Sequence, residues 1–147
     1  MKYNPIDIAR QFNFVREAQI QNTGLMVESI QHWSGGQKGE SWCAYFMLFV
    51  FDIAYGGKEN NPLKRSGAVQ DIYDAAKDKE VSIPMPGDLF IYVNDANHAH
   101  HIGLVTSINP LSGIAGNTSE DGRSSNGDRV AEHTLITNPA HIKFLRF

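Results

Sequence analysis

The sequence predicts an α+β domain in which N-terminal helices pack on a mostly antiparallel β-sheet. Apolar residues at helical spacing occupy the first half of the chain, and short apolar or alternating runs occupy the second half, after Pro86-Gly87. Helices followed by strands, rather than alternating with them, indicate an α+β arrangement. The 147 residues, 41% apolar and 20% charged, fit one globular domain over 1–147.

Four segments carry the helical pattern. They cover residues 6–15 (with Pro5 near the start), 25–33, 41–55 and 68–79. The segment 41–55 is apolar nearly all round and ends in Gly56-Gly57. A helix of that kind is buried on several sides, so we expect 41–55 to be the central helix.

Five later segments read as strands. They cover residues 89–93, 101–108, 114–117, 130–137 and 142–147. In 101–108, His101, Gly103 and Val105 are expected on one face, and Ile102 and Leu104 on the other.

Composition excludes several classes of partner. The net charge is −3 and no basic cluster exceeds Lys64-Arg65, which argues against a nucleic-acid partner. The longest apolar run, 44–50, is far shorter than the roughly 20 residues that span a bilayer. Residues 1–7 lack the apolar core and cleavage box of a signal peptide. We expect no membrane span, and delivery without a standard signal.

Cys43 is the single cysteine, so it forms neither an internal disulfide nor a thiolate-rich zinc site. It lies in the first turn of the predicted helix 41–55, where free N–H groups and the helix dipole favour a thiolate. The alternative is an inert buried thiol, since free cysteine is among the most buried residue types. A neighbouring base is needed to choose between them.

His101 is the best candidate for that base among the six histidines. Gly103 lies on the same predicted strand face and leaves room for a helix carrying Cys43 to approach. A Cys–His pair needs about 2.6–3.2 Å between heavy atoms. Asn117, at the end of the next predicted strand, is a candidate to orient the imidazole, and its alternative role is a strand-ending turn. His32, His133 and His141 are interpreted as surface or edge residues.

A metal site is the rival interpretation of the group formed by His98, His100 and His101. Strand alternation puts His100 and His101 on opposite faces, and Asp95 is the only carboxylate placed to complete a site. The polar loop 119–128 holds Glu120, Asp121 and Asp128, but their spacing does not match an EF-hand. We therefore predict no metal and no cofactor.

Four short motifs, in order, resemble the CHAP peptidases of the NlpC/P60-type, papain-like group. They are Trp42-Cys43-Ala44-Tyr45-Phe46, Pro86-Gly87-Asp88-Leu89, His101-Ile102-Gly103-Leu104-Val105 and Gly116-Asn117-Thr118, and residues 22–28 are similar to the preceding helix of small phage and bacterial members. The resemblance covers about residues 10–137. It implies a papain-like fold with Cys43 as nucleophile, His101 as general base and Asn117 as orienting group.

One departure concerns the third residue. Many relatives carry Glu two positions before this Asn, where the chain has Ala115. Asn117 therefore orients His101 alone, or the role falls to another group such as Glu132. The backbone N–H of Cys43 is a candidate oxyanion donor, and Gln37, six residues earlier in a glycine-rich loop, could add a side-chain amide.

The resemblance implies a peptidoglycan hydrolase, an amidase or endopeptidase that cuts an amide in the stem peptide or cross-bridge of the bacterial wall. It would act at the cell wall or periplasm, delivered by lysis (as a phage endolysin) or by a non-classical secretion route, with an inhibitor or immunity protein as partner if it is a secreted toxin. The alternatives are a thiol acyltransferase or deamidase on a protein or small amide, and a non-catalytic wall-binding domain. The sequence selects neither the bond cut nor the oligomeric state.

Overall fold

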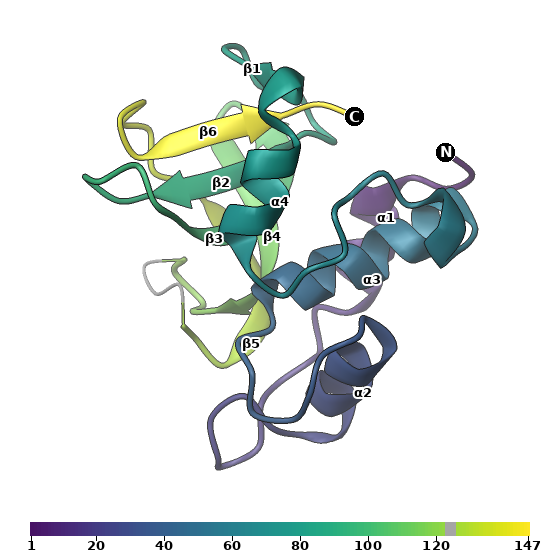
Figure 1. The fold of residues 1–147 in the computed structure, drawn as a ribbon. Helices are drawn as coiled ribbons and strands as arrows, with labels where there is room; N and C mark the ends of the chain where they lie inside the picture. The colour runs from purple at the N-terminus through teal and green to yellow at the C-terminus, as the bar shows by residue number, and fades with distance from the viewer. Residues whose placement is uncertain (123–125) are drawn as a thin grey trace.

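The computed structural model describes residues 1–122 and 126–147, which form a helical layer on one face of a β-sheet (Figure 1). The α-helices are α1 (Pro5–Gln11), α2 (Leu25–Trp33), α3 (Cys43–Tyr55) and α4 (Val69–Ala75), with 3₁₀ turns η1 (Lys58–Asn60) and η2 (Lys77–Lys79). The strands are β1 (Glu80–Val81), β2 (Leu89–Val93), β3 (Ala99–Ile108), β4 (Leu111–Thr118), β5 (Arg129–Thr134) and β6 (Ile142–Leu145). The predicted α+β class is confirmed.

The six strands of the described ranges form one sheet in the order β1-β6-β2-β3-β4-β5. Every neighbouring pair is antiparallel. β1 is absent from the sequence prediction because two residues are too few to show alternation, and it forms by pairing with the end of β6.

Helix α3 is the centre of the fold. It packs against β3 and β4, and α1 and α2 flank it (Figure 1). Its apolar sequence explains this position, because every face of the helix meets another element. The helix begins at Cys43 and ends at Gly56, which adopts the left-handed conformation that glycine tolerates best (φ 80°).

Helix α1 ends at Gln11, earlier than the predicted 6–15. The following residues leave the helix to join the sheet edge: Val15 accepts a backbone hydrogen bond from Val130, and Arg16 forms a bridge with Arg129 of β5. Tertiary pairing therefore overrides the apolar spacing that suggested a longer helix.

The two faces of the sheet carry separate apolar clusters. Ile102 and Leu104 of β3 belong to the core under the helices. Val105 belongs to a smaller cluster on the opposite face, together with Phe90 and Tyr92 of β2. The alternation predicted for 102–105 is confirmed, and it decides where the candidate site residues point.

Candidate functional site

Cys43 is the first residue of α3, as predicted, and is only 3% exposed. The helix has no side-chain cap and no acidic residue in its first turn. The first helical backbone bond runs from Phe46 to Trp42, so the N–H groups before Phe46 have no partner within the helix. This end of α3 therefore presents N–H donors outside the helical ladder, and those of Cys43 and Ala44 lie at the buried sulfur.

The thiol of Cys43 lies at the backbone of Ile102, the residue after the candidate base. The pairing of β3 with β4 begins at Leu104, which lies opposite Ile114. Ile102 precedes this pair, so Cys43 contacts β3 where β3 is not paired with β4. Burial raises the pKa of Cys43 to about 11, and the backbone hydrogen bonds around the sulfur oppose this only in part. The expectation that the helix start favours a thiolate is wrong for this structure, because desolvation outweighs the helix dipole.

His101 is 1% exposed and lies among aromatic rings. Its ring centroid is 5.7 Å from that of Tyr92 and 6.1 Å from that of Phe90. Burial lowers the pKa of His101 to about 3, with smaller contributions from His133 and His100. Neither ring nitrogen has a hydrogen-bond partner in the described part of the chain, and so none joins His101 to Cys43.

The prediction that Gly103 leaves room for the helix carrying Cys43 is wrong. A Cβ on Gly103 would come within 2.4 Å of the Phe90 ring and 2.7 Å of the Ile114 carbonyl oxygen. Phe90 packs on the sheet face opposite α3. The close approach of α3 occurs instead at Gly116 on β4, where a Cβ would meet the side chains of Trp42 and Phe46 at 2.8 Å.

Strand alternation predicted that His100 and His101 lie on opposite faces of the sheet, and this prediction is wrong. The register of β2 with β3 shifts between Tyr92 and Val93, so that Tyr92 pairs with His101 and Val93 with Ala99. His100 is the extra residue of this bulge, and both imidazoles approach the Tyr92 ring. Tyr92 and His100 also line an open hollow of about 450 Å³, which thus adjoins the candidate base.

Asn117 is fully buried near the end of β4 and has a left-handed backbone (φ 51°). The register of β4 with β5 shifts between Ala115 and Thr118, so strand alternation does not assign the Asn117 side chain to either face of the sheet. Its side-chain nitrogen donates a long hydrogen bond to Asn126 (3.4 Å), and its side-chain oxygen has no partner among the described residues. Asn117 and His101 are thus buried on neighbouring strands.

Unsatisfied polar atoms concentrate at these two residues. Among the described side chains, six buried nitrogen or oxygen atoms lack a partner, and three of them belong to His101 and Asn117. A buried polar group without a partner costs about 1–3 kcal/mol, so such groups in a native fold call for an explanation. A site that completes its hydrogen bonds when substrate binds is one such explanation.

The structure does not bring the other predicted polar groups to Cys43. Gln37 is exposed, and within the described ranges its side chain forms no hydrogen bond; its backbone N–H donates to Glu40 (2.6 Å). Glu132 pairs with Ile114, which places it on the helical face, where it binds Arg10 through two hydrogen bonds (3.0 and 2.8 Å). Glu132 is therefore occupied elsewhere.

His133 lies on β5, an edge strand of the sheet, as the edge interpretation predicted, but its side chain is buried, so the surface interpretation is wrong. Sequence reasoning also missed Tyr92 and Phe90, which hold the imidazole of His101; their alternation with Leu89 and Ile91 was the available signal. In the part of the chain that the structure describes, no group of three or more His, Cys, Asp or Glu could hold a metal ion. The loop 119–128 includes residues 123–125, which lie outside that part.

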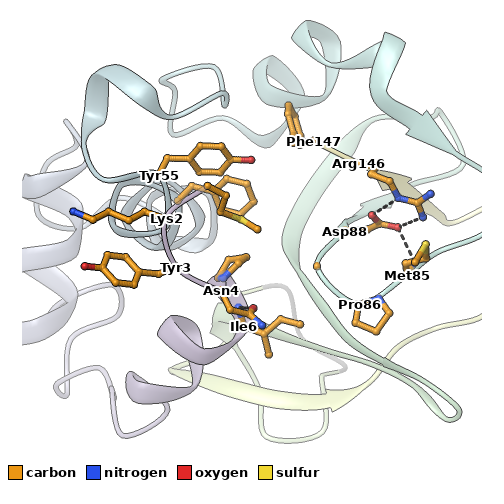
Figure 2. A pocket seen from close by; sticks show the side chains of 14 residues that line it. Lys2, Tyr3, Asn4, Ile6, Tyr55, Met85, Pro86, Asp88, Arg146 and Phe147 are labelled. Carbon is orange, nitrogen blue, oxygen red and sulfur yellow. Dashed lines mark hydrogen bonds and ion pairs between the residues drawn. The ribbon is translucent and has the colours of Figure 1, made fainter.

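Asp88 of the motif Pro86-Gly87-Asp88-Leu89 has a structural role. Its buried carboxylate accepts hydrogen bonds from the Met85 backbone (2.7 Å) and from Arg146 (2.8 and 2.7 Å), as Figure 2 shows. It borders a hollow of about 550 Å³ that Phe51 and Tyr55 also line, which places this hollow toward the opposite end of α3 from Cys43.

Compared with known proteins, the chain matches no family model, no curated protein and no solved structure. Within the described ranges, no helix combines the length and the apolar character needed to cross a bilayer.

Proposed function

We propose that the protein is a cysteine-dependent amide hydrolase with Cys43 as nucleophile, His101 as general base and Asn117 as the group that orients His101. One observation carries the proposal. The residues selected from the sequence as base and orienting group hold three buried polar atoms, on adjacent strands, that have no partner in the described part of the chain, and the Cys43 thiol touches the backbone next to His101. An amide is sufficient as the third member of such a triad.

The proposed reaction begins with a neutral thiol and a neutral imidazole. As the Cys43 sulfur bonds to the substrate carbonyl carbon, its proton passes to His101, and the oxyanion faces the free N–H groups at the start of α3. The carbon–nitrogen bond then breaks and His101 gives the proton to the leaving amine. Water, deprotonated by His101, hydrolyses the thioester, and the proton returns to the sulfur.

The substrate-free geometry sets a requirement on this mechanism. Cys43 and His101 are both buried and share no hydrogen bond, and the His101 ring packs on Phe90, on the sheet face opposite α3. Catalytic hydrogen bonds are often long or misaligned without substrate and tighten in the Michaelis complex. Substrate binding must therefore bring the sulfur and the imidazole together.

Peptidoglycan is the proposed substrate, with the scissile amide in the stem peptide or cross-bridge. This part of the proposal rests on the resemblance of the four motifs to CHAP and NlpC/P60-type peptidases, as does the papain-like description of the fold. It implies action at the bacterial cell wall or periplasm.

The test is digestion of purified sacculi, with the soluble fragments identified by mass spectrometry. The wild-type protein should release muropeptides, and Cys43→Ala should lower release by about 10⁴-fold or more, because removing the nucleophile of a triad removes most of its catalysis. Ser29→Ala, which removes an exposed hydroxyl on α2, is the matched control and should retain full activity. Full release by Cys43→Ala would refute the mechanism, and the fragment masses identify the bond.

A second candidate function is favoured by the burial of Cys43 and His101: a non-catalytic wall-binding domain. The same sacculi distinguish it, because such a domain would sediment with them and release nothing. An acyltransferase would release little soluble material in water but would attach an added amine, such as hydroxylamine, to the acyl group.

A further inference from the structure

His133 belongs to the same buried face as the His101 ring, and the Thr118 side chain of β4 reaches it there. It pairs with Gly113 across β4 and β5, and Gly113 faces the Phe90 ring. His133 is 8% exposed, and a Cβ on Gly122 would overlap its imidazole, so the loop after β4 packs directly on the ring. A row of buried polar side chains thus crosses three neighbouring strands.

Hydrogen bonds fix the protonation of His133. Its Nδ1 lies 3.0 Å from the backbone oxygen of Thr134, and a carbonyl oxygen can only accept, so Nδ1 carries the proton. Burial lowers the pKa of His133, which keeps the ring neutral at neutral pH. Its Nε2 then has a free lone pair, and the Thr118 hydroxyl, 3.4 Å away, donates to it.

Thr118 directly follows Asn117, whose left-handed backbone is uncommon for a residue other than glycine. Backbone hydrogen bonds hold both residues: Gly127 donates to Asn117 (3.0 Å) and Asp128 donates to Thr118 (3.1 Å). The side chain of Thr118 is buried and directed to His133. The turn at Asn117 is therefore held by backbone contacts and by the imidazole.

We propose that His133 is a positioning residue: by accepting the hydrogen bond of Thr118 it holds the left-handed turn at Asn117 and directs the Asn117 amide toward His101. This inference rests on the proposed function for its catalytic consequence. A neutral His133 also suits the reaction, because His101 carries a positive charge midway through it and a second charge on the same face would oppose that step.

The variants separate the hydrogen bond from the presence of a histidine. His133→Phe fills the space without an acceptor, whereas His133→Gln keeps one group that donates to Thr134 and one that accepts from Thr118. His32→Gln, which removes an exposed imidazole from α2, is the control. Thr118→Val removes the hydroxyl and leaves His133 in place, so it replaces His133→Phe should that variant fail to fold.

The first readout is nuclear magnetic resonance of Asn117 in the full chain: its backbone coupling constant, which reports φ, and its side-chain amide signals. We expect His133→Phe and Thr118→Val to change both, and His133→Gln and His32→Gln to keep the wild-type values. Folded His133→Phe or Thr118→Val protein with unchanged Asn117 signals would overturn the proposal, whatever the activity.

The second readout is hydrolysis of sacculi. We expect His133→Phe to lower kcat by about tenfold to a hundredfold with little change in KM, since a displaced orienting group weakens only the transition state. His133→Gln should restore most of the rate. A kcat loss equal in His133→Gln and His133→Phe contradicts a hydrogen-bonding role. A wild-type protein without activity refutes the proposed function, and the Asn117 signals still decide the positioning role.

Discussion

The two ends of helix α3 differ in how the buried polar side chains near them are hydrogen-bonded. Toward the C-terminal end, the buried Asp52 carboxylate accepts hydrogen bonds from Trp33 Nε1 (3.0 Å) and Asn61 Nδ2 (2.8 Å) and forms an ion pair with Arg65. At the N-terminal end, the Cys43 thiol lies at the backbone of Ile102, and the neighbouring His101 and the buried Asn117 hold three polar atoms that have no partner among the described residues.

The contrast separates a structural network from a candidate reactive site. A buried charge whose partners are all in place fixes the elements around it, here α2, α3 and the segment after η1. Unpartnered buried atoms weaken the fold, and a partner that arrives with the substrate is one explanation for their presence. The predictions below test whether the two ends differ in solution as they do in the structure.

The largest expected effect is on the free energy of unfolding. Asp52→Asn removes the charge that three donors share, and we expect it to destabilise the protein by about 3 kcal/mol, as when one partner of a buried ion pair is removed. His101→Leu removes two unpartnered nitrogens from an aromatic environment, so its cost should be below about 1 kcal/mol or reversed in sign. Urea denaturation of both variants measures the difference.

Equal destabilisation by Asp52→Asn and His101→Leu would contradict the comparison, because it would mean that the His101 imidazole has partners in solution. The hydrolysis rates of the same two variants should show the reverse order of effects. Asp52→Asn, assayed well below its melting temperature, should keep the hydrolysis rate of the folded protein, whereas His101→Leu should lose it.

The reactivity of the Cys43 thiol is the next test. With a pKa near 11, the thiolate at pH 7 is about a hundredfold rarer than that of an ordinary exposed cysteine, and burial limits access further. Alkylation by iodoacetamide, followed by mass spectrometry, should be slow in the native protein, rise about tenfold per pH unit up to pH 10 and become fast in urea. A rate that already levels off below pH 8 would show a resting thiolate–imidazolium pair instead.

The sequence predicted those features that depend on local pattern. Cys43 at the start of a buried helix follows from the uninterrupted apolar run, and the faces of Ile102 to Val105 follow from strand alternation. The bulge at His100 did not follow, because a single extra residue reverses the alternation without leaving a pattern of its own. The thiol pKa was mispredicted for a related reason: the sequence shows the helix start but not how completely other elements cover it.

The burial and backbone conformation of Asn117 and the burial of His133 were harder to predict from the sequence. Asn117 was selected by its place at the end of a strand, and its burial and left-handed backbone depend on how the loop after β4 returns to the sheet. His133 has polar neighbours in sequence, so nothing local marked it as buried; the packing of Gly122 on its ring is a contact between different segments.

The smallest effect we predict is the pH dependence of stability. The pKa of His101 is lowered from 6.5 to about 3, so between these values the unfolded chain binds a proton that the folded protein does not. Stability should therefore fall as pH decreases below 6.5, by up to about 1.4 kcal/mol per pH unit for this group. His100 and His133, whose pKa values burial also lowers, act in the same direction.

Comparing wild type with His101→Leu between pH 7 and 5 isolates the contribution of His101, because most carboxylates stay ionised in that range. The variant should lose less stability on acidification, and the two curves should converge or cross as pH falls. Parallel curves would mean that His101 takes up its proton equally in the folded and unfolded states. In that case the imidazole would be hydrated or partnered in solution, and the N-terminal end of α3 would be satisfied as fully as the end that holds Asp52.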